Sequence, residues 1–180
     1  MASEPQPGVS VRVAAPFDSA AIARVQVASW QAAYRSLMPD SFLDALSPET
    51  RAEQWHTILR EAERDERTWA GIHDGVLAGF ASAGPSRDFR AGLRTGEIYA
   101  LYTLPGAWGS GLGAELLREA TTWLPARGFE EATLWVLAEN ARARSFFERD
   151  GWEFDGLEMD VRFGDRRVAE MRYRKRLPLE

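Results

Sequence analysis

The sequence predicts an α+β fold with a mixed, mostly antiparallel central sheet and flanking helices. The elements follow one another as strand, two helices, three strands, helix, strand, helix and two strands. Hairpins therefore surround a single β-α-β unit, which gives one parallel strand pair among antiparallel neighbours. Of the 180 residues, 45% are hydrophobic, enough for one core. We therefore expect a disordered tail over 1–8 and a single domain over 9–180.

The N-terminal third is predicted to form one strand and two amphipathic helices. Valines alternate with polar residues over 9–13, which is the period of a half-buried strand. Pro16 suits the start of a helix that contains Trp30 and Tyr34. Apolar residues at helical spacing predict the second helix over 48–64.

The centre of the chain is predicted to form a hairpin, a further strand and a helix. Asp74 and Gly75 mark the turn of a hairpin over 68–84, because this dipeptide matches the twist of paired strands. A loop over 86–95 leads to the third strand. A glycine-rich turn then opens a helix that stops near Gly128.

The C-terminal part is predicted to form a buried strand, a short helix and a final hairpin. The apolar run ATLWVLA over 132–138 indicates the buried strand. The segment over 140–151 has Asn140 as its N-cap candidate. Gly164 and Asp165 form the turn between the two closing strands.

Composition and charge argue against nucleic acid, a membrane and a metal ion as partners. The formal net charge of −5 disfavours a protein that follows a phosphate backbone, so no nucleic-acid partner is expected. We find no leader-like segment and no run of about 18 apolar residues, so we expect no membrane contact and a cytoplasmic location. The chain has no Cys, and His56 and His73 stand apart, so no metal site is expected.

The stretch GEIYALYTLPGAWGSGLGAELLREA over 96–120 predicts a phosphate-binding turn. Backbone N–H groups at a helix N-terminus have no partner within the helix, and the helix dipole is positive there. No Lys follows the glycines, so the P-loop pattern fails. Residues 109–114 fit the dinucleotide pattern G-x-G-x-x-G/A, but a dinucleotide domain needs more than one β-α-β unit. The diphosphate turn of acyl-CoA transferases is the third candidate.

Two motifs resemble the GCN5-related N-acetyltransferase superfamily. LYTLP followed by the glycine cluster is similar to the central motif, [RQ]-x-x-G-x-[GA] after a strand that ends in a hydrophobic residue and Pro. ENARARSFFERDGWEFDG is similar to the second signature, an Asn before a short helix that ends in Gly and an aromatic residue. ASWQAAYRSLMPDSFLDAL looks like the substrate-side helices of small-molecule members. The resemblance covers nearly the whole chain and implies the acyl-CoA N-acyltransferase fold, in which the parallel strands splay apart.

The resemblance implies that acetyl-CoA binds between the splayed strands as co-substrate. Its pantetheine arm would pair with backbone on the central strand, and its diphosphate would lie on the glycine turn. The implied cofactor-binding residues are Leu101, Tyr102, Thr103, Trp108, Gly109, Ser110, Gly111, Leu112, Gly113, Ala114, Asn140, Phe146 and Phe147. The alternative for Asn140 is that it serves only as a helix cap, and the alternative for the two Phe is that they are only core residues.

Three positions depart from the family pattern. Trp108 and Ser110 stand where the family usually has Arg or Gln and often another Arg. The diphosphate then depends on backbone dipoles with less help from side-chain charge. Either binding is weaker, or Arg142 and Arg144 compensate. Phe147 stands where many members have a Tyr that protonates the departing thiolate.

Loss of that Tyr leaves two routes for the leaving group. A thiol has a pKa of about 8.5, so CoA can leave as a thiolate and take a proton from water. Tyr99 or Tyr102 can also substitute as the acid.

The resemblance implies direct attack of a primary amine on the thioester in a ternary complex. The amine arrives mostly protonated at pH 7, and a carboxylate at the site can remove that proton. Glu97 lies where the family often carries such a residue, although a solvated strand-end Glu is the alternative. The period of two places Glu97 on the face of Tyr99 and Leu101.

The acceptor is expected to be a small amine. Trp30 and Tyr34 lie one helical turn apart and, with Trp69, are candidates for its pocket, with core packing as the alternative. The acidic net charge favours a cationic acceptor. A non-catalytic acyl-CoA sensor, a longer acyl donor and an NAD-dependent dehydrogenase remain as alternatives, and family habit suggests a homodimer.

Overall fold

The computed structural model describes residues 8–178, so the tail predicted over 1–8 lies outside the described residues apart from Gly8. Short 3-10 turns stand at Pro16–Asp18, Pro105–Ala107 and Pro125–Arg127. In chain order the strands and α-helices are β1 (Val9–Val13), α1 (Ser19–Tyr34), α2 (Asp40–Asp44), α3 (Pro48–Glu61), β2 (Arg67–His73), β3 (Val76–Pro85), β4 (Thr95–Thr103), α4 (Leu112–Trp123), β5 (Glu131–Leu137), α5 (Ala141–Arg149), β6 (Glu153–Phe163) and β7 (Arg166–Arg176).

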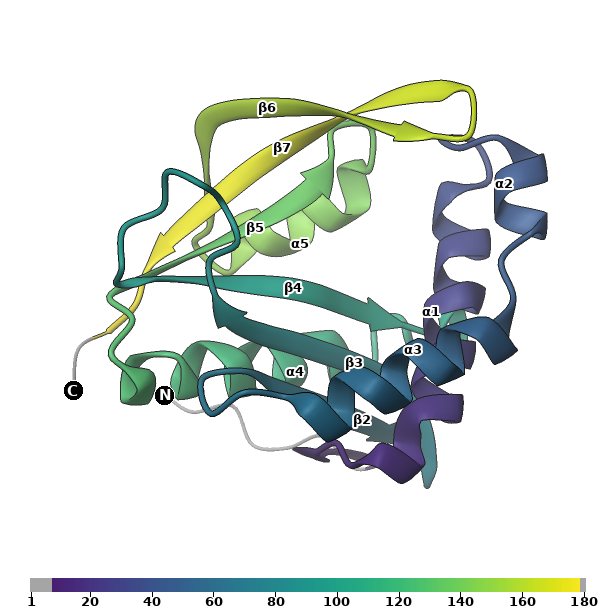
Figure 1. Cartoon of the computed structure of the whole chain (residues 1–180), viewed down its shortest axis with the longest axis horizontal. Coiled ribbons are helices and arrows are strands. Elements are labelled where there is room, and N and C mark those ends of the chain that lie inside the picture. The colour runs from purple at the N-terminus through teal and green to yellow at the C-terminus, as the bar shows by residue number, and fades with distance from the viewer. Residues whose placement is uncertain (1–7, 179–180) are drawn as a thin grey trace.

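The strands form one sheet in the order β1-β2-β3-β4-β5-β7-β6 (Figure 1). Every neighbouring pair is antiparallel except β4 with β5. This topology confirms the predicted α+β fold with one parallel pair. It also excludes the doubly wound sheet of a dinucleotide-binding domain, and with it the dehydrogenase alternative.

Turn and cap residues explain where several elements begin and end. Asp74 and Gly75 have φ angles of 51° and 79°, the left-handed values that a tight hairpin turn requires. Ser47 caps α3, because its Oγ accepts a hydrogen bond from the Thr50 N–H at 3.1 Å. The helix ends at Glu61, slightly before the predicted end at residue 64.

The sequence prediction missed α2. This helix has five residues, too few for an apolar period to stand out from the surrounding loop. Its Leu43 is fully buried and belongs to a core cluster with Tyr34 and Val168. Tertiary packing therefore stabilises α2.

Helices cover both faces of the sheet (Figure 1). On one face, α4 packs across β1 to β4 through the fully buried Leu112, Leu116 and Leu124. A Cβ on Gly96 would lie 2.9 Å from the Leu124 side chain, so a larger residue there would push α4 away. On the other face, α1 and α3 pack around Phe80.

The β6–β7 hairpin extends beyond the sheet toward α2, where the yellow and blue ribbons approach each other in Figure 1. Phe163, at the end of β6, contacts Phe42 of α2 edge-on, with ring centroids 5.4 Å apart. The last hairpin of the chain thus meets the N-terminal helices.

A β-bulge in β4 reverses the direction of its side chains. The register against β3 shifts at Tyr99, which has no partner there. Ile98 packs on the α4 side before the bulge, and Leu101 does so after it. Tyr102 instead lies on the α1 side. The predicted common face of Glu97 and Leu101 is therefore wrong, because alternation was assumed to continue through Tyr99.

Candidate active site

β4 and β5 pair only near their first residues and then separate. Pairing runs from Thr95 with Glu131 to Glu97 with Thr133, whereas both strands continue beyond it. Figure 1 shows the two strands diverging toward α1. A cavity of about 600 Å³ opens there, lined by β4, the turn before α4, α5 and one end of α1.

Most predicted site residues line this cavity. They are Tyr34, Leu101, Tyr102, Thr103, Trp108, Gly109, Gly111, Gly113, Ala114, Asn140, Phe146 and Phe147. The remaining ones, Trp30, Glu97, Tyr99, Ser110 and Leu112, are not among its lining residues.

The α4 N-terminus points free backbone N–H groups at the cavity. Gly109 and Gly111 have φ angles of 81° and 87°, a conformation that favours glycine. The first hydrogen bond of the helix runs from the Glu115 N–H to the Gly111 carbonyl. The N–H groups of Gly113 and Ala114 therefore have no acceptor within the helix, and they can bind an anion.

Ser110 and Leu112 support this turn from behind. The Ser110 hydroxyl donates to the Ala107 carbonyl at 2.7 Å and accepts from the Leu112 N–H at 3.3 Å. The Leu112 side chain is fully buried in the core under α4. These contacts fix the shape of the turn.

Arg142 and Trp108 meet across the cavity. The guanidinium of Arg142, in α5, lies 3.5 Å from the centre of the Trp108 ring. The Trp108 Nε1–H donates to the Thr103 carbonyl at 3.1 Å. Burial lowers the pKa of Arg142, which still remains a cation. Arg144 is instead held by the Tyr173 hydroxyl and a backbone carbonyl and does not line the cavity.

Asn140 and the two Phe of α5 occupy the other wall. Asn140 caps the helix, because its Oδ1 accepts from the Ala143 N–H at 3.1 Å. The cap uses only Oδ1 and leaves the Nδ2 group as a donor beside the cavity. Phe147 is 7% exposed and belongs to the core cluster under α4. The ring of Phe146 packs against the ring of Phe147, with centroids 5.2 Å apart. The cap and core roles are thus compatible with lining the cavity.

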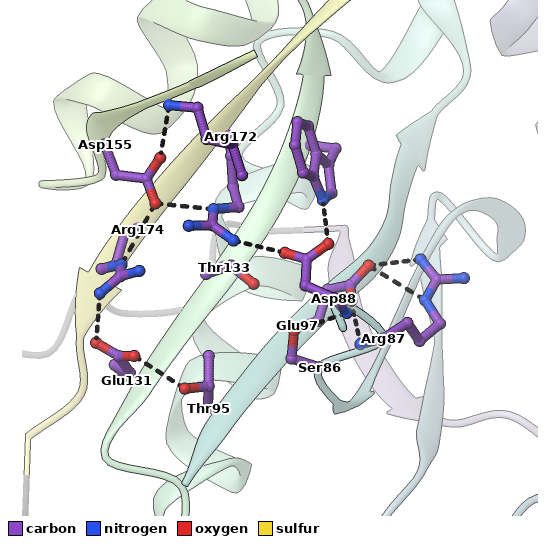
Figure 2. A network of polar contacts seen from close by, with 12 residues as sticks. Ser86, Arg87, Asp88, Thr95, Glu97, Glu131, Thr133, Asp155, Arg172 and Arg174 are labelled. Carbon is purple, nitrogen blue, oxygen red and sulfur yellow. Dashed lines mark hydrogen bonds and ion pairs between the residues drawn. The ribbon is translucent and has the colours of Figure 1, made fainter. Parts of the chain in front are cut away.

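Glu97 is held in an ion pair (Figure 2). Its carboxylate accepts hydrogen bonds from Arg87, at 2.8 Å from the backbone N–H and at 2.6 and 3.2 Å from the guanidinium. The Glu97 side chain is 3% exposed. In this arrangement the carboxylate is occupied and lies away from the cavity.

Tyr99 lies beside this pair. The Arg87 guanidinium lies 4.2 Å from the Tyr99 ring centre, and the Tyr99 hydroxyl donates to the Pro85 carbonyl at 2.6 Å. Burial raises the pKa of Tyr99, so its hydroxyl stays protonated. Its hydrogen bond points away from the cavity lining.

A second polar network links the loop after β3 to the C-terminal strands (Figure 2). Asp88 accepts hydrogen bonds from Trp135 at 3.2 Å and from Arg172 at 2.9 Å. Arg172 also donates to Asp155 at 2.8 Å. Sequence reasoning did not find this network, because its members lie far apart in the chain.

Aromatic side chains form the α1 end of the site. Trp30 packs edge-on against Tyr34, with ring centroids 5.6 Å apart. The centroid of the Trp30 ring lies 6.1 Å from those of Tyr102 and Phe163. Among the described residues, its buried Nε1 has no hydrogen-bond partner. Trp69, the third residue predicted for the acceptor pocket, lies elsewhere. It packs under α4 against Trp123, with ring centroids 5.5 Å apart.

Glu170 is a further ionisable group that sequence reasoning missed. It lies half-buried in β7, and burial raises its pKa. No local motif marks it, because its surroundings come from other strands and α1.

The diverging strands, with a helix N-terminus at the mouth of the cavity, define the class of acyl-CoA-dependent N-acyltransferases. The sequence over residues 29–152 matches the Acetyltransferase (GNAT) family. The chain belongs to this family, which confirms the resemblance seen in its motifs.

Relatives agree with this assignment. The chain is 32% identical over 135 residues to the uncharacterized N-acetyltransferase YuaI of Bacillus subtilis, covering 73% of each chain. It is 30% identical to a mycothiol acetyltransferase of Saccharomonospora viridis over 72% of this chain but only 47% of that protein. The fold matches yncA of Salmonella typhimurium with its cofactor acetyl-CoA, at a TM-score of 0.71, 21% identity and coverage of 96% and 95%.

The described residues contain neither a helix that could span a membrane nor a metal-binding cluster. Over residues 8–178 no helix is both long and apolar enough to cross a membrane. The same part of the chain has no group of three or more His, Cys, Asp or Glu side chains placed to hold a metal ion.

Proposed function

We propose that this acetyltransferase transfers the acetyl group of acetyl-CoA to the primary amine of a small molecule by direct attack in a ternary complex. The observation that carries the proposal is the cavity between β4 and β5. It runs from the N-terminus of α4 to Tyr34 at the end of α1, so one site can hold donor and acceptor together.

The diphosphate of CoA would lie on the α4 N-terminus. Gly109, Gly111, Gly113 and Ala114 line the cavity there and offer backbone donors. Arg142 would supply the positive charge that Trp108 and Ser110 do not. This division of roles replaces the side chains that the family usually has at those two positions.

The pantetheine arm would lie along β4 after the bulge. Residues 101–103 pair with β3 on one edge, but β5 has diverged, so the backbone groups on their other edge have no strand partner beside the cavity. The arm can also take a hydrogen bond from Asn140 Nδ2 and pack against Phe146. To pair with the Thr103 carbonyl it must displace a present donor, because that oxygen accepts from the Trp108 indole at 3.1 Å and from the Ser29 hydroxyl at 3.2 Å.

The chemistry needs an oxyanion site and a proton for the thiolate. Backbone N–H groups at the splayed strand would stabilise the tetrahedral oxyanion. Of the two tyrosines considered as acids, Tyr102 lines the cavity and Tyr99 does not. Burial raises the pKa of Tyr102, so its hydroxyl stays protonated and can donate to the departing sulfur. We therefore assign the acid role to Tyr102.

The general base predicted from the sequence is Glu97. Glu97 remains a candidate by family position, but its three hydrogen bonds from Arg87 favour a structural role. It can act as a base only if Arg87 moves away.

The surroundings of Tyr34 indicate the chemical character of the acceptor. The aromatic cluster at the α1 end suits an amine with an apolar body, and the net charge of −5 favours a cation. The name of the mycothiol acetyltransferase relative also supports a small-molecule acceptor. A homodimer and a cytoplasmic location stay predictions.

A thiol-release screen tests the proposal. The protein is mixed with acetyl-CoA and a broad panel of primary amines, and release of CoA is followed with a thiol reagent. We expect amine-dependent release. Thermal stabilisation by CoA without release from any amine would instead favour the acyl-CoA sensor. Propionyl-CoA and succinyl-CoA in the same assay test a longer acyl donor.

A further inference from the structure

Two buried or half-buried carboxylates on the α1 side of the sheet differ in their partners. Glu97 has its cation in Arg87. Glu170 forms no ion pair within residues 8–178, and its neighbour on the strand face, Arg172, is already paired with Asp88 and Asp155. Among the described residues, Glu170 therefore has no cation within ion-pair distance.

The register of β7 fixes where Glu170 points. It pairs with Leu137 of β5 and Met159 of β6, so it stands in the interior of the sheet. Val168, two residues earlier on the same face, packs in one cluster with Tyr34. The Glu170 side chain therefore faces α1 and its aromatic residues.

Two tyrosines connect Glu170 with the cavity. Tyr34 and Tyr102 both line it. Leu137, which pairs with Glu170 across the strands, packs in one cluster with Tyr34, and Tyr102 packs against that cluster. Burial raises the pKa of both tyrosine hydroxyls. Arg142 acts on Tyr34 and Arg51 acts on Tyr102 in the opposite direction. Glu170 is not itself a lining residue of the cavity, but its strand register places it beside the cluster that contains Tyr34 and Tyr102.

An unpaired carboxylate at this depth is costly, and a cation brought by a ligand removes that cost. Burial already raises the pKa of Glu170, which makes the carboxylate a stronger proton acceptor than one in water. Both properties suit a group that meets a protonated amine.

We propose that Glu170 binds the ammonium group of the acceptor and accepts its proton, and that the acceptor is a small primary amine with an apolar or aromatic body. The inference rests on the acetyl transfer proposed above and names the residue that receives the acceptor. Trp30 and Phe163 pack against the Tyr34 cluster and would supply an apolar wall for that body.

The proton balance is complete. One proton of R–NH₃⁺ passes to the Glu170 carboxylate and then to solvent. The amine lone pair forms the C–N bond, the C–S bond breaks, and its electron pair leaves with CoA sulfur. A second proton from nitrogen reaches that sulfur by way of the Tyr102 hydroxyl, which is restored. The products are the amide, CoA thiol and one released proton.

The test compares Glu170→Gln with Glu158→Gln, which removes the same charge from an exposed position on β6. Calorimetry measures binding of 2-phenylethylamine to the CoA-saturated protein, with 2-phenylethanol as the uncharged analogue. Thiol release gives kcat/KM for the amine and KM for acetyl-CoA from pH 6 to 9.

We expect Glu170→Gln to weaken binding of 2-phenylethylamine at least about tenfold and to leave binding of 2-phenylethanol unchanged. Its kcat/KM for the amine should fall about 10² to 10⁴ fold, the usual contribution of a general base, with KM for acetyl-CoA unaltered. Its kcat/KM should also rise about tenfold per pH unit, because only free amine then reacts, and alkyl ammonium groups titrate near pH 10. Glu158→Gln should match wild type, and Glu170→Asp should restore a flatter pH profile.

Equal amine binding and coinciding pH profiles for wild type and Glu170→Gln would overturn the assignment, as would a wild-type protein that does not bind 2-phenylethylamine. A wild type that binds the amine but releases no CoA contradicts the proposed function alone. In that case, loss of binding in Glu170→Gln still supports Glu170 as the ammonium site, and unchanged binding overturns it.

Discussion

Arg142 brings positive charge to a cleft in which the other predicted phosphate-binding groups are neutral backbone amides. Its side chain reaches the cavity from α5 and stacks on Trp108 of the opposite wall. The sequence left Arg142 and Arg144 as equal candidates for this role. Their contacts in the folded chain separate them, because Arg144 is held by Tyr173.

Replacing Arg142 by Ala should raise the Kd for CoA about tenfold, since a hydrogen bond to a charged group contributes roughly 1.5–3 kcal/mol and part of this site faces water. Calorimetric titration with CoA measures the change. Arg118→Ala is the control, because Arg118 pairs with Glu115 on the exposed side of α4. The same loss in both variants would mean that net charge, and not Arg142, attracts the diphosphate.

The Arg87–Glu97 pair allows the structural and catalytic roles of Glu97 to be distinguished. Arg87→Met leaves the nearly buried carboxylate with a single backbone donor, so the free energy of unfolding at pH 7 should fall by about 1–3 kcal/mol in urea denaturation. Adding Glu97→Gln to that variant should recover part of the loss.

Glu97→Gln alone should keep the shape of the wild-type pH–rate profile. A profile that loses its acidic limb would restore Glu97 as the base. Sequence alone could not anticipate the pair, because the path of the loop over 86–94 decides where Arg87 points.

Among the elements, the turn before α4 owes its function to backbone conformation. Gly109 and Gly128 have similar φ angles of 81° and 90°, and a Cβ on either would meet no atom within 4 Å. Only Gly109 lines the cavity. The two positions therefore separate backbone strain from ligand contact.

Gly109→Ala and Gly128→Ala should each lower stability by about 1–2 kcal/mol, the usual cost of a left-handed conformation for Ala, and thermal melts measure it. Gly109→Ala alone should weaken CoA binding, because its Cβ would hold the diphosphate away from the amides. Unchanged CoA affinity in Gly109→Ala would place the diphosphate elsewhere.

Sequence patterns predicted most elements of this fold and failed at two for identifiable reasons. Hydrophobic periods, Asp74-Gly75 and Gly164 marked the hairpins and the main helices. The period of two then misplaced Leu101, because a bulge at Tyr99 leaves no mark on residue type. α2 was missed because its stability comes from contacts made by Leu43 with distant residues.

At the scale of the whole molecule, the proposed acceptor end of the site joins residues from the N-terminal helices and from the C-terminal hairpin. Trp30 comes from α1 and Phe163 from the β6–β7 hairpin, and their rings lie 6.1 Å apart. Local motifs predicted the cofactor end, which is built from consecutive residues. The acceptor end needs long-range packing, so Glu170 and Phe163 were not found from sequence.

Phe163→Ala should raise KM for 2-phenylethylamine about tenfold and leave KM for acetyl-CoA unchanged, because it removes a wall of the acceptor site only. Steady-state thiol release measures both constants. Phe154→Ala is the matched control, since Phe154 lies on the same strand but packs near Tyr173. A higher KM for acetyl-CoA in Phe163→Ala would show that the hairpin also shapes the donor site.

The early separation of β4 from β5 has a consequence for the lifetime of the protein. The inner edges of the two strands act as a sheet with one member missing, and an extended pantetheine chain would complete it. A ligand that binds only the folded state raises the free energy of unfolding by RT ln(1 + [L]/Kd), where [L] is the free ligand concentration. Starvation for coenzyme A should therefore expose this protein to faster proteolysis, so that its abundance follows the supply of its own donor.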